Sequence, residues 1–431
     1  MRWRVVLSVV VLVLCGCTGT RTTAQARTAI VRANPWAGKG VWLRADTHVH
    51  TTFSDGSSSV EELVTKAEQN GLDVIAITDH LDRNLKGATP EYFAAIDNAR
   101  KAHPRIVVLA GAEWNLPPSG GDDHAVILVP AAAERTLTEF KTLFDDLDPD
   151  GKPSPTLRPL HDPRLASDGL RWLQQHATYD GVSPVVVYEH PSRRNAHSVE
   201  AADIVKGWRA VNELVIGFAG APGHQGKAPI GGYTYKETAL DRWDPAAARV
   251  GDAWDTLLKD GFDVWAAYAP SDFHNAAPTD LNDFWPGQFS STWLYAPERT
   301  QNGVLRALRA GSFFADHGRF VQRAEIAVST PGLPREALAG EAVRVPVGTP
   351  LRLTVRVEPV SPNQAIDSLE IIGVSREGAR VLRSDRPTDG TLSYSGPTPE
   401  GGIVFRARGY HVSPDGSRLA FYTNPVRVVT K

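Results

Sequence analysis

Hydrophobic and polar positions follow two different patterns along the chain, and the change between them falls near Phe320. From Val41 to that point, short apolar runs alternate with segments of helical periodicity. The apolar runs predict strands at Val41–Thr47, Leu72–Ile77, Ile106–Ala112, Ala125–Val129, Val185–Tyr188, Val215–Ala219 and Val264–Ala269. Strands that alternate with helices over this length predict an α/β fold, either a barrel or a doubly wound sheet.

Two helices carry clear end signals. Ser59-Val60-Glu61-Glu62 has the pattern of a capping box and predicts a helix that Gly71 ends. Thr89-Pro90 predicts the start of a second helix, which ends near His103. Residues 145–168 are rich in proline, aspartate and glycine, and they predict an inserted loop.

Beyond Phe320 the period of the pattern changes to two. Leu351–Val357 alternates between apolar and polar residues, and Ser368–Val374 and Ile403–Ala407 do so less regularly. Turns rich in glycine and proline separate these runs. The pattern predicts an all-β sandwich domain over residues 321–431, after an α/β domain over residues 41–320.

The first residues have the pattern of an export signal. Arg2 and Arg4 precede an apolar run, Val5–Leu14, which is shorter than the ~20 residues needed to cross a bilayer. Leu14-Cys15-Gly16-Cys17 resembles the lipobox of bacterial lipoproteins. The resemblance implies a signal peptide over residues 1–16, a lipid on Cys17, and anchoring to the bacterial cell envelope on its periplasmic or surface side. Residues 17–40 are then a tether, and a plain secretory signal is the alternative.

Composition narrows the chemistry. The net charge is −3 with both signs well mixed, which gives no sign of a nucleic-acid-binding surface or of a particular protein partner. Both cysteines lie in the first 17 residues. Beyond them the chain can form no disulfide, so a metal ion in the fold must be held by nitrogen and oxygen atoms.

Histidines and carboxylates gather where predicted strands end. They are His48 and His50, His80, Glu113, His190, and Asp272 with His274. The carboxyl ends of parallel strands open on one face, so these groups are expected to converge. His124 precedes its strand instead, which means that this strand runs antiparallel or that its boundary lies elsewhere.

A single histidine at a strand end is usually a hydrogen-bonded structural residue, but this density of imidazoles and carboxylates needs counter-charge. Divalent cations supply it, and mixed nitrogen and oxygen ligands suit zinc, manganese or iron. The ordered motifs His48-Val49-His50-Thr51, Ser54-Asp55-Gly56, Thr78-Asp79-His80, Glu113, His124, Glu189-His190-Pro191 and Ser271-Asp272-Phe273-His274 resemble those of the PHP (polymerase and histidinol phosphatase) superfamily.

The resemblance covers about residues 41–320 and implies a distorted seven-stranded α/β barrel with two or three metal ions. Position by position, it implies one metal at His48, His50, Glu113 and Asp272, a second at Glu113, His124 and His190, and a third at Asp55, His80 and His274. Glu113 and Asp272 are then catalytic as well as metal-binding. Asp79 and Glu189 are expected to orient His80, His190 or their neighbours.

The implied activity is hydrolysis of a small-molecule phosphoester by a hydroxide held between two metals. Arg193 and Arg194 are predicted to bind the anionic substrate, with Arg319 in reserve. His317 is a further candidate, and Trp114, Trp285 and Phe273 either line the pocket or simply pack. Two other functions stay open: a carbamate or carboxyl-ester hydrolase of the same barrel type, and a surface binding protein whose barrel is ancillary.

Overall fold

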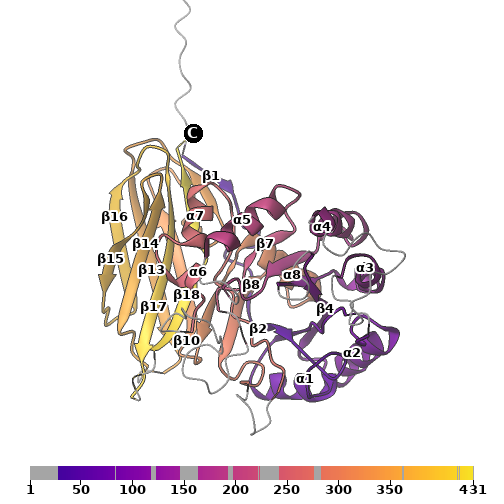
Figure 1. Ribbon diagram of the computed structural model, residues 1–431. Coiled ribbons are helices and arrows are strands. Elements are labelled where there is room, and N and C mark those ends of the chain that lie inside the picture. The colour runs from indigo at the N-terminus through magenta and orange to yellow at the C-terminus, as the bar shows by residue number, and fades with distance from the viewer. Residues whose placement is uncertain are drawn as a thin grey trace, which may run out of the picture.

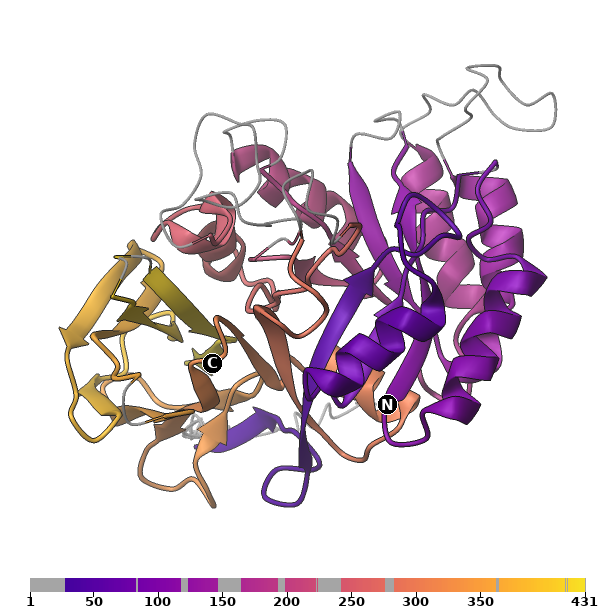
Figure 2. The same cartoon turned by 90° about the horizontal axis from the view of Figure 1, so that it is seen from below.

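The computed structural model describes residues 28–430, except 83, 118–122, 146–163, 193–197, 222, 224–241, 276–282, 362–363, 415 and 417. An α/β portion and a β-rich region lie side by side (Figure 1). Seen from below, the orange strands of residues 290–317 lie between the two (Figure 2). The predicted lipidation site at Cys17 and the predicted signal peptide lie outside the described residues.

A row of hydrogen-bonded strands runs through the α/β portion. In spatial order they are β8 (Ser290–Ala296), β2 (Val41–Val49), β3 (Val74–Ile77), β4 (Val107–Asn115), β5 (His124–Leu128), β6 (Val185–Tyr188) and β7 (Val215–Phe218). Strands β2, β3 and β4 are parallel, β5 is antiparallel to both of its neighbours, and β6 is parallel to β7. The predicted α/β class is therefore confirmed.

The helices start and end where side chains satisfy their backbone. They are α1 (Val60–Gln69), α2 (Pro90–Ala102), α3 (Thr136–Phe144), α4 (Arg164–His176), α5 (Ser198–Arg209), α6 (Pro245–Ala248), α7 (Ala253–Lys259) and α8 (Gln301–Ala310), with a 3-10 turn at Ala131–Ala133. The Ser59 side chain accepts from the Glu62 N–H at the start of α1, and Thr89 caps α2, as predicted. None of the described helices is both long and apolar enough to cross a bilayer.

The closed seven-stranded barrel is not confirmed. Val264–Ala269, predicted as its last strand, meets β7 through a single bridge between Trp265 and Gly217. The N–H of Ala267 donates to the Asn424 side chain and that of Ala269 to Thr292, so these amides do not form a ladder. At the other end of the row, the sheet continues from β8 into β9 (Phe313–His317).

The β-rich region contains two sheets. One has the order β11 (Ala337–Leu338), β10 (Val321–Ser329), β13 (Pro350–Pro359) and β16 (Thr391–Pro397). The other comprises β14 (Ser368–Ser375), β15 (Gly378–Asp385), β17 (Ile403–Val412), β18 (Arg418–Thr423), β19 (Val426–Val429), β12 (Ala342–Arg344) and β1 (Ala29–Arg32). Both contribute to one apolar core, and the predicted runs at 351–357, 368–374 and 403–407 lie within β13, β14 and β17.

The β-sandwich domain predicted over residues 321–431 is not confirmed, and β9 pairs with β8 on one side and with β18 on the other. One sheet therefore runs through both parts of the molecule. The main apolar core also joins Tyr410 and Tyr422 of the β-rich region to Trp243, just before α6, and to Trp254 of α7.

The end of the predicted tether is a part of the fold. Strand β1 pairs antiparallel with β12, and Asn34 and Trp36 are buried. The Asn34 N–H donates to the Glu341 carboxylate, and the Trp36 indole donates to the Tyr295 carbonyl. The prediction of a free tether over residues 17–40 is therefore wrong from residue 29 onward, because these contacts bury its polar and aromatic groups.

A candidate metal centre

A β-bulge in β2 directs the side chains of His48 and His50 toward Glu113. The register between β2 and β3 shifts between Asp46 and Val49. Ala45 belongs to one apolar cluster, whereas Val49 belongs to the cluster that packs against helices α1 and α2. Because the alternation of the strand slips at this bulge, His48 and His50 both face the carboxylate of Glu113.

Strands β3, β4 and β5 bring the next group of ligands to the same place. His80 follows β3 and is bridged to Glu113 near the end of β4. His124 is the first residue of β5 and lies opposite Asn115. Since β5 runs antiparallel, its amino end lies beside the carboxyl end of β4. This explains why His124 precedes its strand and still lies among the other candidates.

Two of the remaining candidates have strained backbones. His190, after β6, has φ 32°, and Asp272 has φ 48°. Residues other than glycine seldom adopt this region, and it costs about 1–3 kcal/mol each. The Asp272 N–H donates to the His48 carbonyl, and the His50 N–H donates to that of Phe273, so β2 holds this segment in place.

Five imidazoles surround the Glu113 carboxylate, which is almost completely buried. Its Oε1 lies 3.3 Å from His48 Nε2, 2.9 Å from His124 Nδ1 and 3.5 Å from His190 Nε2. Its Oε2 lies 3.1 Å from His50 Nε2 and 3.2 Å from His80 Nδ1. Asp272 Oδ1 lies 3.2 Å and 3.3 Å from the Nε2 atoms of His48 and His50. We call this set the inner cluster.

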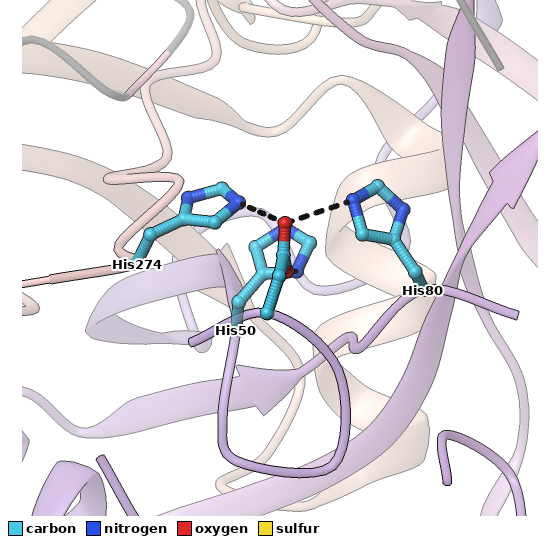
Figure 3. A group of neighbouring side chains, drawn as sticks. His50, His80 and His274 are labelled. Atoms are coloured by element: carbon cyan, nitrogen blue, oxygen red, sulfur yellow. Dashed lines mark ion pairs between the residues drawn. The ribbon is translucent and has the colours of Figure 1, made fainter. Parts of the chain in front are cut away.

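A second, more exposed set surrounds Asp55. Its carboxylate oxygens lie 3.2 Å from His50 Nδ1, 3.6 Å from His80 Nε2 and 3.4 Å from His274 Nε2. The rings of His80 and His274 point from two sides toward a carboxylate oxygen between them, with the His50 ring close by (Figure 3). The Asp55 side chain is 50% exposed, whereas that of Glu113 is 2% exposed. We call His50, Asp55, His80 and His274 the outer cluster.

All nine predicted ligands therefore meet, although more than 200 residues separate the first from the last. Three groups have ligand atoms within 4.8 Å of one another: His50, Asp55, His80 and His274; His48, His50 and Glu113; and His80, Glu113 and His124. Asp272 and His190 join them through their contacts with His48 and Glu113.

The donor atoms fit divalent cations. Within the inner cluster, the buried atoms His48 Nε2, His50 Nε2, His80 Nδ1, Glu113 Oε1 and Asp272 Oδ1 have no hydrogen-bond partner among the described residues. Leaving such atoms unsatisfied is costly, and all five point into the inner cluster. Imidazole nitrogen and carboxylate oxygen are the ligands of zinc, manganese and iron.

Burial and neighbouring charges shift the pKa values of several groups in and beside the inner cluster. Burial opposes protonation of His48, but the carboxylates of Glu113 and Asp272 outweigh it and raise the pKa of His48 to about 10. Burial lowers the pKa of His80 to about 3, although Glu113 acts in the opposite direction. Burial also raises the pKa of Glu189 to about 8. Cations in the cluster would replace protons as the partners of these groups.

Further side chains orient the ligands. Thr78 Oγ1 lies 2.7 Å from His48 Nδ1, so the other ring nitrogen is the one presented to the cluster. Asp79 accepts from the N–H and hydroxyl of Thr51 and from the Ser54 hydroxyl, so it holds the loop that carries Asp55. The Glu189 side chain is buried and makes no hydrogen bond within the described part of the chain.

Of the other predicted residues, those that the structure describes lie outside both clusters. Arg193 and Arg194 lie outside the described residues. The Arg319 guanidinium lies beside Gly71, which precedes β3, and thus at the opposite end of this strand from His80. The His317 ring packs against Trp243 and Phe289.

The aromatic candidates pack within the fold. Trp114 packs on Phe140, with its N–H donated to a backbone carbonyl. Phe273 stacks on Trp285 at a centroid distance of 4.8 Å. The contacts of Trp114, Trp285 and Phe273 fit packing rather than the lining of a substrate pocket.

Sequence reasoning missed two side chains next to His274. Asp283 accepts from the His274 N–H, and Ser57 donates to the His274 carbonyl. Ser57 follows the Ser54-Asp55-Gly56 motif and could have been considered with it. Asp283 belongs to no motif, and its role depends on backbone contacts that only the folded chain creates.

Comparisons with known proteins agree with this geometry. Residues 46–150, which carry His48 through His124, match the family model of the PHP domain. A stretch of 108 residues is 38% identical to an uncharacterised protein of Methanocaldococcus jannaschii, covering 25% of this chain and 50% of that protein. A stretch of 100 residues is 32% identical to a probable phosphatase of Vibrio campbellii, covering 22% of this chain and 37% of that protein.

The chain thus spans half or less of the length of these two relatives. Among solved structures, it is similar to a two-domain protein from Bacteroides vulgatus that contains a predicted PHP-like metal-dependent phosphoesterase. That alignment covers 94% of this chain and 99% of the other at 16% identity, with a TM-score of 0.41.

Proposed function

We propose that this protein is a metal-dependent phosphoesterase that acts on a small molecule. The observation that carries the proposal is the Glu113 carboxylate, buried within 3.5 Å of five imidazole nitrogens. The PHP-domain match over residues 46–150 and the similarity to a probable phosphatase support it.

Two or three divalent cations, zinc, manganese or iron, would be held by the inner and outer clusters and would supply positive charge to a phosphoryl group. Glu113 offers one oxygen to each of two groups of histidines. Thr78 fixes which nitrogen His48 presents, and Asp79 fixes the loop of Asp55. The exposed side of Asp55 and His274 is where a substrate would enter.

The test combines metal analysis with a substrate panel. Residues 18–431, purified and reconstituted with zinc, manganese or iron, are expected to hold at least two ions per chain. They are expected to hydrolyse phosphomonoesters or phosphodiesters in preference to carboxyl esters and aryl carbamates. Trace metal only, or a preference for the neutral esters, would overturn the proposal.

We also propose that the protein is exported and anchored to the cell envelope through a lipid on Cys17. The support is the apolar run followed by Leu14-Cys15-Gly16-Cys17. Mass spectrometry of membrane-extracted protein is expected to find a modified Cys17 at the mature amino terminus. A mature protein that begins elsewhere and is soluble without detergent would contradict this.

A further inference from the structure

His274 belongs to the outer cluster but lies on no strand. Two side chains from other parts of the chain hold its backbone instead. Its N–H donates to Asp283 Oδ2 at 2.7 Å, and its carbonyl accepts from the Ser57 N–H at 2.8 Å and the Ser57 hydroxyl at 3.1 Å. We call Asp283 and Ser57 the His274 clamp.

Asp283 is placed to act as a rigid part of this clamp. It is 5% exposed, and the same Oδ2 atom also accepts from the Asn275 N–H at 3.0 Å. Its own N–H donates to the Asn275 carbonyl at 2.9 Å, so backbone and side chain both tie it to this segment.

The outer cluster needs such support more than the inner cluster does. The side chains of Asp55 and His274 are 50% and 20% exposed, whereas His48 and Glu113 are 0% and 2% exposed. Packing therefore fixes the inner ligands. The His274 ring is oriented by the clamp, by its contact with the Asp272 carbonyl and by stacking on His50 at 4.0 Å.

We propose that Asp283, assisted by Ser57, is a positioning residue that sets the metal affinity of the outer cluster without affecting that of the inner cluster. The inference rests on the proposed function only in that metal ions bind to both clusters. It requires no particular substrate.

The experiment measures metal stoichiometry and affinity by elemental analysis and by calorimetric titration of metal-free protein with zinc. Asp283→Ala is expected to weaken zinc binding at the outer cluster by about 10- to 100-fold, the usual effect of losing a group behind a ligand. Asp283→Asn should keep wild-type affinity, because an amide oxygen can accept both N–H groups. Ser57→Ala should have a smaller effect, since its N–H still donates to His274.

Two reference variants separate positioning from general destabilisation. Asp252→Ala removes the side chain that caps α7 away from the clusters and should leave all metal sites unchanged. In a His274→Ala background, Asp283→Ala should cause no further loss of metal, because the ligand that it positions is already absent.

Full outer-site affinity in Asp283→Ala would overturn the inference. So would an equal loss from every site, or an additional loss in the His274→Ala background. These outcomes are distinct from a failure of the proposed function, in which the metal sites respond as expected but the wild-type protein hydrolyses no phosphoester. If Asp283→Ala fails to fold, the wild-type affinity expected of Asp283→Asn and the weakening expected of Ser57→Ala decide the matter.

Discussion

At the scale of single residues, the two oxygens of Glu113 have different neighbours. Oε1 faces His48, His124 and His190, and Oε2 faces His50 and His80. A carboxylate can offer an electron pair on both sides, whereas an amide has one acceptor oxygen and one NH₂ donor. The centre therefore depends on the charge and symmetry of this group as well as on its position.

Replacement of Glu113 with Gln is expected to lower metal content to less than half of the wild-type value. Hydrolysis of a phosphoester should fall by more than about 100-fold, because loss of a shared ligand costs more than the 10- to 100-fold typical of a group behind a ligand. Elemental analysis and kcat/KM measure the two effects. The exposed Glu139→Gln on α3 is the matched control and should change neither. Full metal content in Glu113→Gln would rule out its bridging role.

His103 links helices α1 and α2 and makes stability depend on pH. Its Nδ1 lies 2.9 Å from Glu68 and its Nε2 lies 3.0 Å from Glu61. The hydrogen bond to Glu68 is the main cause of a raised His103 pKa. A group that binds its proton more tightly when folded stabilises the fold below its unfolded pKa, about 6.5 for histidine. The contribution is lost as the pH rises through the higher, folded value.

His103→Gln should therefore cost up to about 1 kcal/mol of unfolding free energy near pH 6, as for an exposed ion pair, and less near pH 9. Urea denaturation of both proteins at the two pH values measures this. Comparing the two proteins at each pH removes other titrating groups, including the metal ligands. The same difference at both pH values would show that the charge on His103 has no part in stability.

At the scale of elements, residues 29–40 connect both portions of the molecule. Strand β1 extends the β-rich region, and the Asn34 side chain then bonds to a residue just before β9 and to its own segment. Its Nδ2 donates to Ser312 Oγ at 2.8 Å, and its Oδ1 accepts from the Trp36 N–H at 3.1 Å. These groups are buried, so water could not replace a hydrogen-bond partner removed by mutation unless the surrounding structure rearranged.

Asn34→Ala is expected to lower the unfolding free energy by about 1–3 kcal/mol, the cost of leaving buried polar groups unpaired. Thermal or urea unfolding measures the loss. Lys39→Ala, an exposed change in the same segment, should stay within about 0.5 kcal/mol of wild type. If Asn34→Ala were as silent as Lys39→Ala, this segment would behave as a tether after all.

Elements whose signals are local were predictable from the sequence. Val185–Tyr188 is an unbroken apolar run and forms β6 with those bounds. Val264–Ala269 gives the same kind of signal, yet its amides bond to Asn424 and Thr292, and no local pattern reveals distant partners. Strand β1 was missed for the same reason, since its partner β12 lies more than 300 residues away.

The centre was more predictable than the fold around it. The metal-ligand candidates lie in short motifs, and the resemblance of their order to the PHP motifs was enough to predict that nine side chains meet. The direction of β5 was not predictable, because His124 alone cannot show which way its strand runs. Asp283 was missed because it acts on the backbone of another residue.

At the scale of the whole molecule, the two portions share both a sheet and a core. Strand β9 bonds to both sides, and a buried ion pair crosses the junction. Arg406 of β17 donates to both oxygens of Asp255 in α7 at 2.7 Å and 2.9 Å, and both side chains are almost fully buried. The β-rich region therefore supports the segment that leads to Asp272.

Arg406→Ala should cost about 3–5 kcal/mol, because it leaves the Asp255 charge buried without its partner. Full-length wild-type protein should unfold in one transition, and the variant in one transition at lower urea. Arg406→Met combined with Asp255→Leu, which removes both charges, should recover part of the loss. Two separate transitions in the wild type would contradict the shared core.

The bulge in β2 has a consequence for natural variation. The bulge moves His48 and His50 onto the face that leads to Glu113, and the bonds to β3 and β8 fix the rest of the strand. Deleting or inserting one codon between Val41 and the bulge would exchange the two faces and send both histidines toward the helices. Single-codon length changes are therefore expected to be absent from functional versions of this strand.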